Sequence, residues 1–275
     1  MHRDKVESLP LTRKKQLLYI IKEEPSLLFF VNFTASFFLL PLAFVGTWGL
    51  LSYSQAATTE GITGLQCFLS ILYPSLCLIP SMMIAGFGIC GVYSVIQRLT
   101  LHTTSRYSEF WIGIKKNWKQ FLISHFILGL LLSLLFINLG IFFYIDATPL
   151  TKLVSLIINV ILLFLFLCFK GYVLFQSTLF NNSYIQILRN SVGFFGKRIG
   201  YNFLSVLNGV VMYVLILFLP GYFRIIPIVF IACYWLVFES LVNYLICIDT
   251  LEEKLPREWT IDFYHHGLEP DEPIK

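Results

Sequence analysis

Six long apolar stretches, separated by short polar segments, constrain the fold of this chain more than any other feature. A transmembrane helix needs roughly 20 consecutive apolar residues, and stretches of about that length occupy residues 27–53, 67–96, 121–144, 153–175, 200–219 and 225–248. Charged residues make up only 13% of the chain, whereas soluble domains carry about 25%. Too little polar surface remains to coat a water-soluble particle. We therefore predict an all-α membrane protein, a bundle of about six transmembrane helices.

This pattern divides the chain into three parts. Residues 1–26 form a basic N-terminal segment, residues 27–248 the six-helix transmembrane domain, and residues 249–275 an acidic C-terminal tail. The first part has no apolar region that ends in a small-residue cleavage site, so we expect no cleaved signal peptide. The first transmembrane helix would then act as the insertion signal.

The basic residues predict the orientation in the membrane. Seventeen of the twenty Lys and Arg residues fall in alternate segments, namely 1–26, 97–120, 176–199 and 249–275. The other connecting segments hold only Lys152 and Arg224, and Lys170 lies inside the fourth stretch. Basic segments remain in the cytoplasm, so we expect a multi-pass membrane protein with both termini cytoplasmic. This alternation also requires an even number of helices.

Two of the basic segments, 108–121 and 184–195, are amphipathic. In each, apolar and aromatic residues recur at helical spacing, and basic residues lie beside or after them. Such helices lie in the membrane interface with lysines directed toward anionic headgroups. We expect the lipid bilayer to contact five residues of the first segment, Trp111, Lys115, Lys116, Trp118 and Lys119. The alternative is a short cytoplasmic helix packed on the ends of the bundle.

Ionisable residues inside the apolar stretches are costly in lipid and often functional. Two stand out, Lys170 in the fourth stretch and Glu239 in the sixth. Counted from the start of their stretches, they lie at depths of about 26 Å and 21 Å. They can therefore pair and line a polar cavity. Alternatively, Lys170 extends to the headgroups and polar neighbours satisfy Glu239.

Neither catalytic nor metal-binding signatures occur. The six cysteines lie in or beside apolar stretches without metal-ligand spacing and are interpreted as packing residues. His125 is interpreted as a structural residue. Gly86, Gly88 and Gly91 match a dinucleotide-binding pattern, but they lie inside an apolar stretch and not after a strand. Gly86, Cys90 and Ser94 recur every four residues, which predicts close helix packing. No catalytic residue, cofactor, metal or nucleic-acid partner is expected.

Three blocks of sequence carry a family resemblance. They are VNFTASFFLLP, which contains Asn32, then PSMMIAGFGICGVYSVIQRL, and then SEFWIGIKKNWKQFLISHFILG. With these blocks the chain resembles the YesL-like family of bacterial membrane proteins, a domain of unknown function. The resemblance implies an association with sugar-importing ABC transporters, and it implies no mechanism.

Two functions therefore compete. In the first, the protein is a non-enzymatic accessory to carbohydrate transport that binds ABC transporter subunits. In the second, it is a small-solute permease with a polar path involving Lys170 and Glu239. Prolines Pro74 and Pro80, which predict a kink in the second stretch, and a weak internal repeat favour the second.

Overall fold

The structure is a computed structural model that describes residues 12–58, 61, 63–102, 104–144, 148–180, 182–196 and 199–254. Within these residues it contains helices and no strand, in the order α1 (Arg13–Glu23), α2 (Pro25–Thr58), α3 (Gly64–His102), α4 (Ser108–Tyr144), α5 (Pro149–Leu179), α6 (Tyr184–Phe195), α7 (Ile199–Phe218), a 3₁₀ turn (Gly221–Arg224), α8 (Ile225–Phe230), a π-helical turn (Ile231–Trp235) and α9 (Leu236–Lys254). Residues 1–11 and 255–275 of the two terminal segments lie outside the described residues. So do the basic residues Lys197 and Arg198 and the side chain of Arg224.

The predicted all-α membrane architecture is confirmed. Five segments of the described chain are long and apolar enough to cross a membrane: α2, α3, α4, α5 and the run from α8 to α9. The remaining predicted stretch, 200–219, corresponds to α7, whose described apolar part, Asn202–Ile216, is shorter. The total of six membrane-spanning helices therefore stays a prediction.

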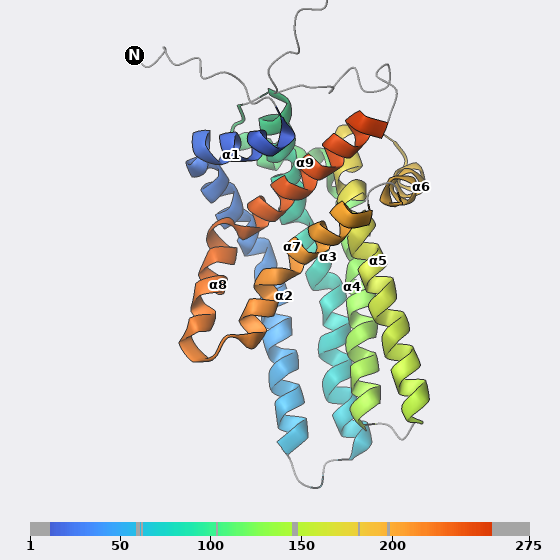
Figure 1. Cartoon of the computed structure of the whole chain (residues 1–275). Helices are drawn as coiled ribbons and strands as arrows, with labels where there is room; N and C mark the ends of the chain where they lie inside the picture. The colour runs from blue at the N-terminus through green and yellow to red at the C-terminus, as the bar shows by residue number, and fades with distance from the viewer. Residues whose placement is uncertain are drawn as a thin grey trace, which may run out of the picture.

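The four longest helices form the body of the molecule. Figure 1 shows α2, α3, α4 and α5 side by side, with α7 and α9 lying obliquely across them. The turn between α7 and α8 ends well short of the lower ends of the long helices, and α1 and α6 lie near the upper end (Figure 1). The last two predicted stretches therefore form a shallower hairpin on one face of a four-helix body.

Small residues bring α3 and α4 into close contact. A Cβ atom on Gly113 of α4 would lie 1.9 Å from Ser94 Oγ, and one on Gly91 of α3 would lie 2.4 Å from the Phe110 ring. Cys90 Sγ lies 3.5 Å from the Gly113 carbonyl oxygen. Since small residues allow backbones to approach in this way, the predicted packing role of Cys90 and Ser94 is confirmed.

The first amphipathic segment, 108–121, does not form a helix separate from the stretch that follows it, and its position in a membrane interface stays a prediction. This segment is the beginning of α4, which continues without a break to Tyr144. The physical reason is that Phe110 and Phe121 are fully buried and Gly113 lies against Ser94, so the segment packs on α3. The second amphipathic segment is a separate helix, α6, which begins with a capping box formed by Ser183 and Gln186.

Helix α3 continues through both prolines that predicted a kink, Pro74 and Pro80. In the described residues, the regular α-helical hydrogen bonding is interrupted at another place, the π-helical turn between α8 and α9. A side chain that inserts among the backbone hydrogen bonds is one cause of such breaks, and Asn32 of α2 does so. Its Nδ2 donates to the carbonyl oxygens of Ile231 at 2.9 Å and Ala232 at 2.7 Å, while its Oδ1 accepts from the Val237 N–H at 3.0 Å.

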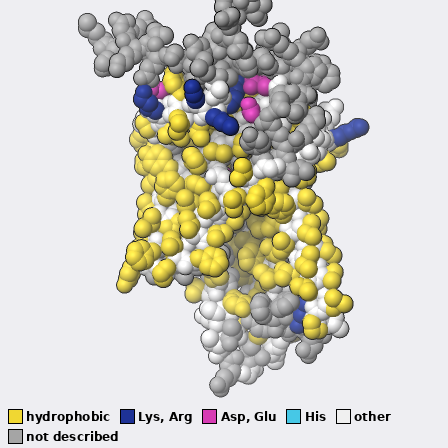
Figure 2. All heavy atoms as spheres, viewed as in Figure 1, with side chains coloured by type: hydrophobic (Ala, Val, Ile, Leu, Met, Phe, Trp, Pro, Cys, Tyr) yellow, Lys and Arg dark blue, Asp and Glu magenta, His cyan; other side chains and the backbone are white. Residues whose placement is uncertain are grey.

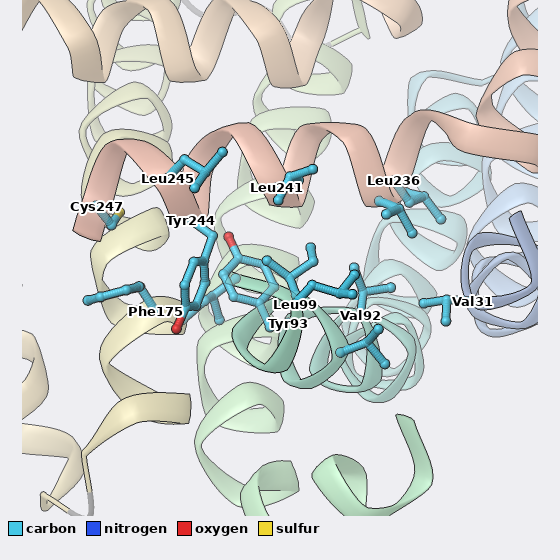
Figure 3. Close-up of a cluster of buried hydrophobic side chains, with 14 of the residues drawn as sticks. Val31, Val92, Tyr93, Leu99, Phe175, Leu236, Leu241, Tyr244, Leu245 and Cys247 are labelled. Atoms are coloured by element: carbon cyan, nitrogen blue, oxygen red, sulfur yellow. The ribbon is translucent and has the colours of Figure 1, made fainter. Parts of the chain in front are cut away.

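A hydrophobic cluster joins α9 to the body. In Figure 3, Leu236, Leu241 and Tyr244 point from α9 toward α3, where Val92 and Tyr93 lie. All five side chains are buried. Each fully buried large apolar side chain contributes roughly 1.5–3 kcal/mol, so this cluster holds the oblique helix in place.

Charge is concentrated at one end of the molecule. Figure 2 shows Lys, Arg, Asp and Glu side chains at the upper end of one face, above a broad belt of hydrophobic side chains. Many large apolar residues of α2 and α5 are exposed, among them Phe44 at 72% and Leu150 at 70%. This distribution is typical of a protein whose apolar belt contacts lipid.

Candidate functional site

The two ionisable residues singled out in the sequence belong to one polar cluster. Lys170 of α5 and Glu239 of α9 interact electrostatically. Lys170 also interacts with His125 of α4, and Glu239 with Tyr93 of α3. Four helices thus bring titratable side chains together between the apolar parts of the bundle.

Lys170 and Glu239 do not form a direct ion pair. Both residues are half-buried, and no ion pair of 4.0 Å or less joins them. The structure therefore brings the predicted pair into one neighbourhood and leaves a gap between the charged atoms. Each charge lacks the close counterion that offsets the cost of removing it from water.

Helix α7 covers the Glu239 side of the cluster. A Cβ atom on Gly209 would lie 2.9 Å from Glu239 Oε1, so the Glu239 carboxylate lies against the backbone of α7 at this residue. One turn away, Ser205 donates a hydrogen bond to Asn243 of α9. The neighbouring Asn208 has a buried Nδ2 without a hydrogen-bond partner in the described structure.

His125 is a member of this cluster that the sequence analysis did not identify. Its ring is 1% exposed and Nδ1 lies 2.8 Å from the Phe121 carbonyl oxygen. Because a carbonyl oxygen only accepts, Nδ1 carries the proton, and Nε2 of the neutral ring is an acceptor. Gly86 provides the space, since a Cβ there would lie 3.1 Å from the ring.

Aromatic rings close the cluster on the side of α3. The Tyr93 ring lies edge-on to those of Phe121 and Tyr244, with centroids 5.7 Å and 6.2 Å away, and Phe175 lies 4.7 Å from Tyr244. Figure 3 shows Tyr93, Phe175 and Tyr244 gathered below α9. These rings therefore pack α3, α4, α5 and α9 against one another beside Glu239.

The five predicted membrane-interface residues are all exposed. Trp111 is 45% exposed and Trp118 38%, and they lie seven residues apart on one side of α4. Lys119 Nζ lies 5.7 Å from the centre of the Trp118 ring. Trp118 in turn stacks on Phe87 of α3. Trp118 thus packs on α3 and Trp111 on Phe38 of α2, both stay exposed, and their placement in a membrane interface stays a prediction.

A second buried polar network ties the N-terminal helix to the end of α9. The Arg13 guanidinium binds both carboxylate oxygens of Glu252, and the two side chains are only 4% and 7% exposed. Arg13 also donates to Gln16 Oε1 at 2.8 Å, and Gln16 donates to the Thr100 carbonyl oxygen of α3 at 2.8 Å. Helix α1 was not predicted from the sequence, and the pairing was not predictable because 239 positions separate Arg13 from Glu252.

Within the described residues, no three His, Cys, Asp or Glu side chains are grouped as metal ligands. The six cysteines are unpaired. The chemistry available at the cluster is therefore that of Lys, Glu, His and Tyr side chains, which bind and transfer protons and donate or accept hydrogen bonds.

Comparisons with known proteins add no assignment. No protein-family model matches the chain, and neither a curated protein nor a solved structure matches it.

Proposed function

We propose that the chain is a small-solute permease whose polar path includes Lys170 and Glu239. The observation that carries this proposal is the interaction of Lys170 with both Glu239 and His125, from three helices, in the apolar part of the bundle. Ionisable residues inside membrane helices are rare and characteristically mark substrate, ion or proton pathways. The π-helical turn between α8 and α9 is a second feature, since π-bulges are frequent at functional sites, and α9 carries Glu239.

The proposed orientation places both termini in the cytoplasm of a bacterial cell. Its support is the concentration of basic residues at one end of the molecule (Figure 2), since basic segments are retained on the cytoplasmic side. In this orientation α1, α6 and the start of α4 lie at the cytoplasmic surface. Trp111 and Trp118 then lie at the level of the headgroups, with Lys115, Lys116 and Lys119 toward anionic lipid.

A second proposal follows from the resemblance to the YesL-like family: the chain is a non-enzymatic accessory subunit of a carbohydrate ABC transporter. One structural observation favours it. The third block of the resemblance presents Trp111 and Trp118 on a rigid surface, held by contacts with Phe38 and Phe87. Rigid, accessible tryptophans are enriched at protein interfaces. Neither proposal assigns an enzymatic reaction.

Uptake into proteoliposomes tests the first proposal. Purified protein is reconstituted and exposed to a panel of radiolabelled sugars, amino acids and alkali cations. We expect at least one solute to be retained above the level of protein-free liposomes. Glu239→Gln and Lys170→Met should reduce this uptake at least tenfold, while the matched surface variants Glu23→Gln and Lys15→Met should leave it unchanged. Uptake that is insensitive to both cluster variants would contradict the proposal.

Purification of the tagged protein in mild detergent tests the second proposal. Stoichiometric recovery of ABC transporter permease subunits, lost in a Trp111→Ala, Trp118→Ala double variant, would support the accessory function. Recovery of the folded chain alone would count against it.

A further inference from the structure

We propose that a furrow between α1 and α9 binds one molecule of phosphatidylethanolamine, with its phosphate at Lys14 and its ammonium at Asp249. The acyl chain then follows the apolar part of the furrow along α9 toward α8. The inference goes beyond both proposed functions and needs neither of them, because it requires only that the helices lie in a bilayer.

Two grooves of the described structure share the same walls. The polar groove has a volume of about 400 Å³ and lies between α1 and the later part of α9, where Lys14 and Asp249 line it. The apolar groove has a volume of about 280 Å³ and lies between the junction of α1 with α2 and the helical run from α8 to α9, where Pro25 and Phe230 line it. Taken together, these volumes fall within the range of about 300–1,000 Å³ that is typical of ligand sites.

The lining residues join the two grooves into one furrow. On the α9 side they recur every three or four positions along one helix face, from Asp249 of the polar groove back to Phe230 of the apolar groove. On the opposite side, a row with the same spacing runs from Lys14 of α1 through Ile21 to Pro25 of α2. A helix rises about 28 Å from Phe230 to Asp249 at 1.5 Å per residue, whereas one leaflet with its headgroups is about 20 Å thick, half of a bilayer. The furrow is therefore long enough for one lipid from headgroup to chain end.

The furrow changes from polar to apolar along its length, as a lipid molecule does. Its polar end lies beside α1, which Figure 1 places near the upper end of the molecule, where Figure 2 shows the charged side chains. Every described side chain that lines the apolar groove is aliphatic or aromatic, and Phe230 and Tyr234 are each 40% exposed there. The polar end thus lies at the level of the headgroups, and the apolar end reaches the belt of hydrophobic side chains.

The charges at the polar end match a headgroup that carries both signs. Arg13 binds both carboxylate oxygens of Glu252, and this pair holds α1 against α9. Lys14 is exposed, and its ammonium donates up to three hydrogen bonds, which suits a phosphate. Asp249, on the opposite wall, is half-buried. A carboxylate accepts about four hydrogen bonds, so Asp249 takes N–H donors of a ligand in addition to its contacts within the protein.

These two groups distinguish among phospholipid headgroups. Every phospholipid presents a phosphate to Lys14, but only some present a cation with N–H donors to Asp249. The choline headgroup has a cation without N–H groups, and the glycerol headgroup has no cation. The ethanolamine headgroup has an ammonium with three N–H donors, as a lysine side chain has. It is therefore the headgroup that satisfies both walls of the polar groove.

Native mass spectrometry of the full-length protein in detergent tests the inference. The delipidated protein is titrated with phosphatidylethanolamine, phosphatidylcholine and phosphatidylglycerol that carry identical acyl chains. We expect one phosphatidylethanolamine to bind about tenfold more tightly than the other two, the effect of one charge-assisted hydrogen bond. Asp249→Asn should remove this preference, whereas Lys14→Met should weaken the binding of all three lipids about tenfold. The matched surface variants Glu23→Gln and Lys15→Met, which do not line the furrow, should change neither.

A photo-crosslinking lipid locates the site. Phosphatidylethanolamine with a diazirine near the end of its acyl chain should label the segment from Phe230 to Leu241 of the wild type. Equal affinity for the three lipids would overturn the inference, and this comparison needs no variant to fold. A preference for phosphatidylglycerol would also overturn it, because Asp249 would then not pair with an ammonium. Labelling confined to the exposed faces of α2 or α5 would show lipid that only surrounds the protein, and the furrow would not be a site.

Discussion

Replacement of Asn32 by leucine removes the side chain that occupies the break between α8 and α9. The residue is fully buried and makes three hydrogen bonds with the backbone of the last predicted stretch, at 2.7, 2.9 and 3.0 Å. Leucine has a similar volume, so packing is largely retained and the loss is one of hydrogen bonds. Ser36 Oγ, 3.2 Å from the Ala232 carbonyl oxygen, remains as a partner for one of the carbonyls.

The expected loss of unfolding free energy can be worked out from two values for the energy of one hydrogen bond. Three hydrogen bonds at about 1 kcal/mol each give about 3 kcal/mol, and the average of about 0.6 kcal/mol for bonds between membrane helices gives about 2 kcal/mol. We therefore expect Asn32→Leu to lower the free energy of unfolding by about 2–3 kcal/mol. Asn32→Asp should be at least as harmful, because it keeps an acceptor for Val237 but loses both donors and adds a charge.

Unfolding in mixed detergent micelles, followed by tryptophan fluorescence, measures these differences. The matched control is Asn159→Leu, which removes a single bond to the Ser155 carbonyl oxygen of the same helix, 3.0 Å long. We expect a loss of about 0.5 kcal/mol there. If Asn32→Leu is as stable as Asn159→Leu, Asn32 does not hold the break and this reasoning is wrong.

Three further perturbations act outside the cluster. Arg13→Glu should cost about 3–5 kcal/mol because it replaces the buried cation that binds Glu252 with a second carboxylate, and addition of Glu252→Arg should recover most of that loss. Gly113→Leu should cost about 3 kcal/mol, since its Cβ alone would lie 1.9 Å from Ser94 Oγ. Burial, with a contribution from the neighbouring Glu23, raises the pKa of Glu24 above its ordinary value of 4.5; ionisation therefore costs stability as the pH rises through this range, and Glu24→Gln should raise the Tm at neutral pH but not at pH values well below 4.5.

Each of these predictions has a control and a contrary result. Lys15→Glu changes an exposed charge beside the same helix turn and should be nearly neutral, and a double charge swap that fails to restore stability would exclude the Arg13 pairing. Gly193→Leu meets no atom within 4 Å, so equal losses at both glycines would contradict the proposed helix contact. A stability difference for Glu24→Gln that grows toward acidic pH would show that the sign is wrong.

The sequence was sufficient for the features that depend on hydrophobic patterning alone. Five of the six predicted stretches coincide with segments long and apolar enough to cross a membrane, and the small residues Cys90 and Ser94 pack as their spacing predicts. Hydrophobic patterning does not predict the structure where aromatic residues occupy both the buried and the exposed side of one helix. In residues 108–121 the aromatic stripe combines buried Phe110 and Phe121 with exposed Trp111 and Trp118, so periodicity did not distinguish an interfacial helix from the start of α4.

The missed features depend on contacts between distant parts of the chain. Asn32 reaches residues about 200 positions away, and the break that it occupies contains no proline of its own. Likewise, α1 is held by a pairing of Arg13 with Glu252 that no local pattern indicates. The proximity of Lys170 and Glu239 could be predicted from their depths along the two helices. The contacts of His125 and Gly209 could not, because they depend on how α4 and α7 pack.

A double-mutant cycle on Lys170 and Glu239 tests most directly whether the two residues act as one electrostatic unit inside the bundle. The free energies of unfolding of Lys170→Met, Glu239→Gln and the double variant are compared with that of the wild type in the same lipid and detergent. We expect the double variant to lose less free energy of unfolding than the two single variants lose together, by about 1 kcal/mol or more. Losses that add within about 0.3 kcal/mol would show that the two side chains are independent, and the intramembrane cluster would then have no basis as a functional site.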